Sequence, residues 1–109
     1  MATTYKTLGQ SNPSATTATT LYTVPSATST VVSTITVCNQ ASTAGTFRVA
    51  VRPAGASLAA QHYVAYDTPI AANDTIALTL GITLATTDVV TVYASSATMS
   101  FNAYGSELS

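Results

Sequence analysis

The side chains best suited to acid–base or nucleophilic chemistry occur once each in this sequence, as His62 and Cys38. Catalysis by a side-chain nucleophile needs a nucleophile, a base and usually an orienting group. Asp67 could orient His62, but five residues separate them, which puts them on opposite faces of the strand predicted there. The sequence also has no G-x-S-x-G turn. We therefore expect no catalytic residues and a protein that is not an enzyme.

Metal binding has equally little support in the sequence. One His and one Cys cannot supply the four ligands of a zinc site. Asp67, Asp74 and Asp88 could help to hold calcium together with loop carbonyls. The segments Asn73–Thr75 and Thr86–Asp88 are more simply explained as turns, in which Asp and Thr side chains bond the nearby backbone. We expect no metal and no cofactor.

Composition narrows the class of partner. The 109 residues fit one domain, and 47% of them are hydrophobic. Only 6% are charged, with a net charge of -1, whereas about 25% of the residues in typical domains are charged. Three basic residues cannot form a nucleic-acid patch, and no apolar run approaches the ~20 residues of a membrane span. The opening residues lack the features of a signal peptide. We expect synthesis in the cytoplasm, with no nucleic-acid or membrane partner.

Short runs of Val, Ile, Thr, Tyr and Phe alternate with turn residues from position 21 onward, which predicts an all-β fold. Seven to eight short antiparallel strands in a single β-sandwich or jelly-roll-like domain would fit this spacing, and the pattern leaves a jelly roll and an immunoglobulin-like order equally open. The expected strands are 21–24, 31–38, 47–52, 62–67, 75–80 with a short continuation at 82–84, 89–94 and 98–104, and a further short segment lies around Ile70.

Alternation along these strands predicts the core. In the strand 31–38, Val31, Ser33, Ile35 and Val37 share one face, and Cys38 is expected to be a small core residue. The expected core comprises Val24, Ile35, Val37, Phe47, Val49, Val51, Ile76, Leu78, Leu80, Val90, Val92, Met99 and Phe101.

Residues 1–20 show no strand or helix period, and Gly9, Asn12 and Pro13 interrupt them. We interpret them as an extended N-terminal arm that precedes a sandwich domain at 21–109. Tyr5 and Leu8 are apolar anchors by which such an arm would dock on a neighbouring subunit; a disordered tail is the alternative.

The low charge suggests that much of the surface is buried against neighbours, where charges would be costly to desolvate. Tyr63 and Tyr93 are candidate interface residues, because they are expected to face away from Val64 and Val92, or else they cap the core. Arg48 and Arg52 lie on the outer face of one predicted strand, where they would either pair with acids of a neighbour or be solvated.

The sequence contains three distinctive runs: LYTVPSATSTVVSTITVCN (21–39), TFRVAVRPAGA (46–56) and YDTPIAANDTIALTLGITLATTDVVTVYAS (66–95). Together with the opening YKTLGQSNPSATTATTLYTVP, they resemble small β-sandwich virion structural proteins of tailed bacteriophages. The resemblance implies a component on the exterior of the virion, and it supplies no catalytic residues.

We therefore expect a homo-oligomeric structural subunit that contacts other virion proteins, such as the major capsid protein or tail proteins. A capsid decoration or cement protein is favoured. The alternatives are a tail, neck or baseplate accessory protein, a receptor- or glycan-binding module at the tail, a small depolymerase, and a pilus or surface-layer subunit.

Overall fold

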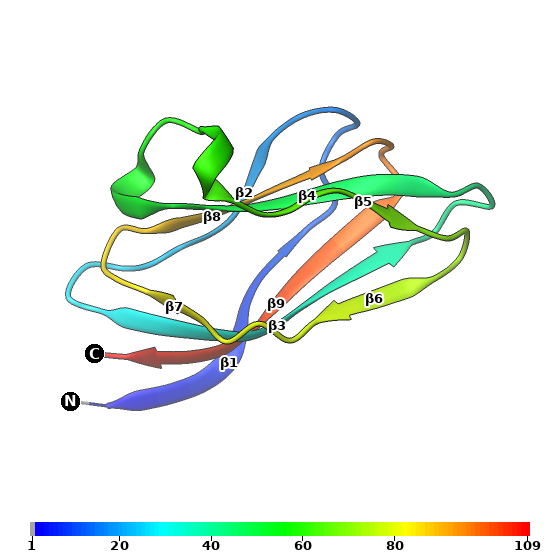
Figure 1. Ribbon diagram of the computed structural model, residues 1–109. Helices are drawn as coiled ribbons and strands as arrows, with labels where there is room; N and C mark the ends of the chain where they lie inside the picture. The colour runs from blue at the N-terminus through cyan, green and yellow to red at the C-terminus, as the bar shows by residue number, and fades with distance from the viewer. Residues whose placement is uncertain (1) are drawn as a thin grey trace.

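The computed structural model describes residues 2–109, which form two antiparallel β-sheets packed face to face (Figure 1). The predicted all-β sandwich is confirmed. Helix in this part of the chain is limited to two short 3-10 turns, η1 (Pro53–Gly55) and η2 (Ala60–His62). The strands are β1 (Thr3–Ser11), β2 (Thr19–Thr23), β3 (Ser29–Asn39), β4 (Gly45–Arg52), β5 (Tyr63–Ile70), β6 (Thr75–Leu78), β7 (Ile82–Leu84), β8 (Val89–Ala94) and β9 (Met99–Leu108).

The strand order is that of a jelly roll. The first sheet has the order β1-β9-β3-β6, with β7 also paired to β3, and the second has the order β2-β8-β4-β5. The pairs β1·β9, β2·β8, β3·β6 with β7, and β4·β5 are those of one long hairpin wrapped into two layers. The order of the strands therefore decides between the two topologies that the sequence left open.

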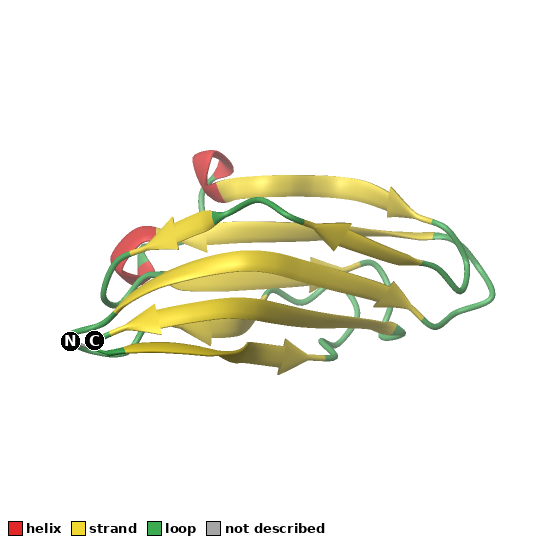
Figure 2. Ribbon diagram, turned by 90° about the horizontal axis from the view of Figure 1, so that it is seen from below, coloured by secondary structure: helices red, strands yellow, loops and turns green. Residues whose placement is uncertain are grey.

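The structure differs from the prediction over residues 1–20, where an extended arm was expected. Residues 3–11 form β1, which lies in the chain's own first sheet and pairs with β9 along its length. Ala2 and Ser109 exchange two backbone hydrogen bonds of 2.7 and 3.0 Å, so the ends of the chain lie side by side (Figure 2). β9 ends at Leu108 rather than at the predicted Tyr104, and β1 covers the edge of this longer strand.

The core lies between the sheets and contains most of the predicted residues. Val51, Ile76 and Leu78 are only partly buried against this core. The prediction that Leu80 belongs to the core is wrong, since its side chain is 50% exposed. Leu80 falls in the break between β6 and β7, where no partner strand holds its side chain inward. Residues of the buried core cluster that the prediction missed are Leu21, Tyr22, Val32, Ile70, Leu84, Ala94 and Ala103.

A β-bulge in β3 reverses the predicted faces of its first half. The register with β9 shifts between Val32 and Thr34, so Val32 turns inward with Ile35 while Val31 is exposed. Beyond the bulge the expected alternation holds. Cys38 lies opposite Ser100 on the outer face, and its side chain is half-buried rather than in the core. A bulge adds one residue to one strand and thereby changes the phase of everything on one side of it.

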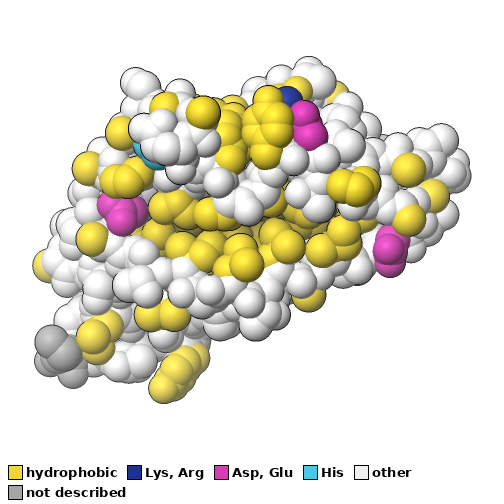
Figure 3. Space-filling model, viewed as in Figure 1, with side chains coloured by type: hydrophobic (Ala, Val, Ile, Leu, Met, Phe, Trp, Pro, Cys, Tyr) yellow, Lys and Arg dark blue, Asp and Glu magenta, His cyan; other side chains and the backbone are white. Residues whose placement is uncertain are grey.

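The two long sides of the sandwich differ. On the side of β1 and β2 the sheets approach so closely that a Cβ at Gly9 would overlap the carbonyl oxygen of Leu21. On the other side, Figure 3 shows a band of hydrophobic side chains in the hollow between the sheets. Partly buried apolar residues of the strands on that side pack against the core: Val51, Ala65, Ile76, Leu78 and Ile82.

Candidate functional site

The outer face of the second sheet carries a cluster of tyrosines around one arginine. The guanidinium carbon of Arg48 lies 4.2 Å from the ring centroid of Tyr66 and 4.2 Å from that of Tyr93. Arg48 also donates to both carboxylate oxygens of Asp67, at 2.6 Å from Nε and 3.3 Å from Nη2. Tyr63 meets Tyr66 edge to face, with centroids 4.9 Å apart. We call these five residues the tyrosine cluster.

Two irregularities in β5 bring these side chains together. The register with β4 shifts between Phe47 and Val49 and again between Val49 and Ala50, and Asp67 has a φ of 48°. Tyr63 and Tyr66, three residues apart, would face opposite ways on a regular strand, but here they are in contact. The structure therefore adds Tyr66 and Asp67 to the predicted Tyr63, Tyr93 and Arg48.

Arg48 is committed to its own chain. The hydrogen bond with Asp67 raises the pKa of the guanidinium above its ordinary value, with a further contribution from the charge of Asp67. A bidentate pair of this kind fixes the guanidinium plane, which lies over the two rings in cation–π geometry. The sequence analysis had offered acids of a neighbour as partners for Arg48. Its carboxylate partner in the structure is intramolecular.

Arg52 anchors the loop that covers part of the same sheet. Its Nε donates to Thr91 Oγ1 at 3.0 Å, and its Nη1 donates to the carbonyls of Gly55 and Ala56 at 3.4 and 3.1 Å. Asp88 also holds the loop, because its carboxylate accepts a hydrogen bond of 2.9 Å from the backbone N–H of Ala54. Arg52 therefore links strand β8 to the loop through hydrogen bonds within its own chain.

Beside the tyrosine cluster, the loop and the sheet border an open hollow. Its volume is about 630 Å³, and its walls are Leu58, Ala59, Ala60, Tyr63 and Tyr66. Tyr66 is 58% exposed there. The hollow is within the usual size range of small-molecule sites.

The outer face of the first sheet has a different character. Cross-strand pairs place one row of side chains beside the next, all of them uncharged. We call this set the uncharged face: Thr3, Tyr5, Thr7, Gln10, Ser29, Val31, Thr34, Thr36, Cys38, Thr75, Ala77, Thr83, Ser100, Asn102, Tyr104, Ser106 and Leu108.

The uncharged face also exposes apolar groups. Tyr5 is 83% exposed, and Val31, Tyr104 and Leu108 are exposed as well. Val31 and Leu108 line a shallow hollow of about 160 Å³ near the two chain ends. Leu8, which was predicted to anchor an arm with Tyr5, instead packs against the core of its own chain. The two residues therefore point in different directions.

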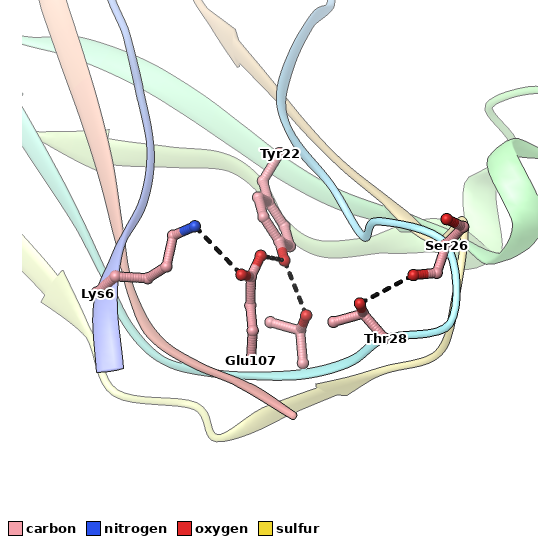
Figure 4. A network of polar contacts seen from close by, with 6 residues as sticks. Lys6, Tyr22, Ser26, Thr28 and Glu107 are labelled. Carbon is pink, nitrogen blue, oxygen red and sulfur yellow. Dashed lines mark hydrogen bonds and ion pairs between the residues drawn. The ribbon is translucent and has the colours of Figure 1, made fainter. Parts of the chain in front are cut away.

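A polar network closes the end of the sandwich near the chain termini (Figure 4). The phenol of Tyr22 donates to Glu107 Oε2 at 2.5 Å. Because this uses the one phenol proton, the Thr30 hydroxyl, 2.8 Å away, donates to Tyr22. Lys6 Nζ lies 3.2 Å from Glu107 Oε1. Tyr22 and Thr30 are buried between the sheets, whereas the Lys6 side chain at the edge strand remains 45% exposed.

The network shifts two pKa values. Burial, followed by the hydrogen bond to Glu107, raises the pKa of Tyr22 to about 12. The hydrogen bond from Tyr22, followed by the hydrogen bond from Lys6, lowers the pKa of Glu107, although burial opposes this. At neutral pH the carboxylate is therefore ionised and the phenol protonated, which is the state that the hydrogen bonds need.

The two remaining charged residues lie in turns and also bond their own chain. Asp74 accepts from the backbone N–H of Thr75 at 2.8 Å, and Asp88 accepts from the backbone N–H of Ala85 at 2.9 Å. All seven charged side chains of the sequence therefore have a partner within the molecule.

The one histidine of the sequence also bonds its own chain. His62 Nδ1 accepts a hydrogen bond of 3.1 Å from the backbone N–H of Ala59, so one ring nitrogen holds the turn η2. Within residues 2–109, no group of three or more His, Cys, Asp or Glu side chains lies close enough to hold a metal ion. Neither of the short helical turns in this range has the length or hydropathy to cross a bilayer.

A scan against protein-family models and searches of curated proteins and of solved structures found no match to this chain.

Proposed function

We propose that this protein is a non-enzymatic structural subunit of a tailed-phage virion, and in particular a capsid decoration or cement protein that binds and bridges neighbouring subunits. The observation that carries the proposal is the uncharged face. It offers a sheet surface of hydroxyl, amide and apolar groups, with Tyr5, Val31, Tyr104 and Leu108 exposed on it. Such a surface can be buried against another protein without desolvating a charge.

The placement of the charges supports the same proposal. Lys6 pairs with Glu107, away from the uncharged face, and Arg48 pairs with Asp67 on the outer face of the second sheet. Protein interfaces are depleted in charged residues at their centre and enriched in tyrosine. The uncharged face matches this composition, whereas a domain that stays dispersed by itself usually carries more surface charge.

The fold is compatible with this role. Jelly rolls occur in viral capsid proteins and in lectins, and a fold by itself does not fix a function. The resemblance of residues 21–39, 46–56 and 66–95 to phage structural proteins favours the capsid or tail over the lectin role. Attachment at many symmetric positions would make weak individual contacts sufficient.

The test is to place one charge at the centre of the uncharged face. Thr36 lies between Asn102 and Ala77 in the middle of the sheet, and Thr36→Lys would bury an ammonium in the proposed contact. Ser57→Lys adds the same charge at an exposed loop position on the other side of the sandwich. Particles purified from producing cells would be analysed by quantitative mass spectrometry for the number of copies of each variant.

We expect the unmodified chain and Ser57→Lys to be present in the particles, and Thr36→Lys to be lost at least tenfold. Absence of the unmodified chain from the particles would overturn the virion proposal. Full retention of a folded Thr36→Lys variant would overturn the assignment of the uncharged face as the contact.

A second candidate function is a receptor- or glycan-binding module at the tail. The hollow of about 630 Å³ beside Tyr63 and Tyr66 favours it, because exposed aromatic rings provide faces on which sugar rings stack. Calorimetry with host surface polysaccharides would test it. Binding that is lost in Tyr66→Ala would support this role, and no binding to the panel would count against it.

A further inference from the structure

The four sheet edges differ in their capacity to accept another strand. β5 contains Pro69 and two shifts of register. β2 has five residues and its own shift between Thr20 and Tyr22. β6 and β7 have four and three residues and are separated at Gly81. β1, with nine residues and no proline, is the longest of these edges.

The backbone hydrogen bonds of Ala2 fix the direction of every group on the first half of β1. Ala2 and Ser109 exchange both of their hydrogen bonds, so they form a hydrogen-bonded pair of the antiparallel ladder. Such pairs alternate with pairs that do not bond each other. In the register of β1 with β9, Thr4 and Lys6 therefore bond β9, while the N–H and C=O groups of Thr3, Tyr5 and Thr7 point to the free edge.

We propose that the β1 edges of two copies of this chain pair antiparallel about a two-fold axis at Tyr5. Tyr5 then lies opposite Tyr5 of the second copy, and Thr3 lies opposite Thr7. All three residues direct their N–H and C=O groups to the free edge. In this register, the three residue pairs form about six interchain hydrogen bonds, which satisfy all of these groups. A two-fold contact requires a surface that is complementary to itself. The segment 3–7 meets this requirement, because each free N–H or C=O group faces its hydrogen-bonding counterpart on the second copy.

The side chains fit the same register. Tyr5, which is 83% exposed in the single chain, gains an aromatic cross-strand neighbour on the uncharged face. Lys6 falls opposite Thr4 of the second copy and not opposite another lysine. Its ammonium lies 3.2 Å from Glu107 Oε1 of its own chain, and the lysine side chain is 45% exposed.

The bulge at Leu8 limits the ladder to residues 3–7, because the register of β1 with β9 shifts between Thr7 and Gly9. The contact is therefore short, and association depends on concentration. The pair joins two uncharged faces into one continuous surface. This inference deepens the proposed assembly function and rests on it, since it names the second copy as the first partner of the subunit.

Amide hydrogen exchange by NMR, run with sedimentation velocity across a range of concentrations, tests the register directly. We expect a dimer to form as concentration rises, with exchange at Thr3, Tyr5 and Thr7 slowing at least tenfold. The amides of Thr4 and Lys6 should be protected at every concentration, because they bond β9. This alternating pattern needs no variant.

Variants at one position add a second readout. Tyr5→Pro removes a donor that points to the free edge and leaves the β1·β9 ladder intact, so a folded monomer is expected. Tyr5→Thr keeps the donor and should still dimerise, more weakly. Dimerisation of Tyr5→Pro equal to that of the unmodified chain would overturn the proposal.

The other outcomes separate this inference from the proposed function. A dimer without protection at Thr3, Tyr5 and Thr7 overturns edge pairing and leaves the assembly proposal standing. A monomer at all concentrations also overturns pairing between copies, while the particle experiment decides the virion role independently. If these amides become protected only after other particle proteins are added, a different chain occupies the β1 edge. That result would overturn the proposal that a second copy of this chain does so.

Discussion

The phenol oxygen of Tyr22 lies 2.5 Å from Oε2 of Glu107, although 85 residues separate them in the sequence. Tyr22 belongs to the second sheet and Glu107 to the first, so this hydrogen bond links the two layers. This hydrogen bond lies at the end of the sandwich near both chain termini. The bond between Thr30 and Tyr22 and the bond from Lys6 to Glu107 complete the polar network there.

Removing the Tyr22 hydroxyl should destabilise the fold. Tyr22→Phe keeps the buried ring but leaves the Glu107 carboxylate without its closest donor. We expect the free energy of unfolding to fall by about 1–3 kcal/mol, measured by urea denaturation. Tyr104→Phe removes a hydroxyl from an exposed ring and should change stability by less than about 0.5 kcal/mol. Equal effects of the two changes would contradict the assigned role of the network.

The lowered pKa of Glu107 makes stability depend on pH in the acid range. The native pKa lies below the unfolded value of about 4.3, so the stabilisation is fully present above that value. It is lost as the pH falls through the native pKa. Glu107→Gln should be less stable at pH 7 and should show a flatter acid limb in a plot of melting temperature against pH. An unchanged acid limb would show that other carboxylates dominate.

The raised pKa of Tyr22 predicts a second loss of stability in alkali. The phenol is protonated in the folded chain to about pH 12, whereas an unfolded tyrosine ionises near pH 10. The stabilisation is therefore present below pH 10 and declines as the pH rises through about 12. Denaturant midpoints measured from pH 9 to 12 should fall less steeply in Tyr22→Phe than in the unmodified chain.

The close approach of the sheets at Gly9 predicts a strong effect of one methyl group. A Cβ at this position would overlap the carbonyl oxygen of Leu21, so Gly9→Ala must push β1 away from β2. We expect a loss of about 2–3 kcal/mol or more, measured by thermal and urea unfolding. Gly81→Ala is the matched control. It meets nothing within 4 Å but has a φ of 63°, so it should lose only about 1–2 kcal/mol.

The anchoring of the loop by Arg52 can be tested without unfolding the protein. Arg52→Lys keeps the charge but cannot bond Thr91, Gly55 and Ala56 with one planar group. We expect amide exchange in residues 53–62 to accelerate several-fold, while exchange in β3 and β9 is unchanged. Loop exchange equal to that of the unmodified chain would mean that the Asp88 bond to Ala54 is sufficient.

The sequence by itself determined the class of fold and much of the core. Alternation of apolar and polar residues, with turn residues between the runs, is a local property that any strand of a half-buried sheet must satisfy. It placed β8 at its observed bounds and identified Phe47, Val49 and Phe101 as core residues. It also predicted that Arg48 and Tyr93 face outward, where the structure brings them together.

The tertiary structure decided what depends on a partner strand. The bulge near Ser33 exchanged the faces of Val31 and Val32, and the irregularities in β5 put Tyr63 against Tyr66. A bulge is set by pairing with a neighbour, so no periodicity within one strand reveals it; the Asp67-Thr68-Pro69 run was the one local signal of the break in β5. Residues 3–11 have no pattern of their own and became a strand because the edge of β9 offered unpaired backbone groups.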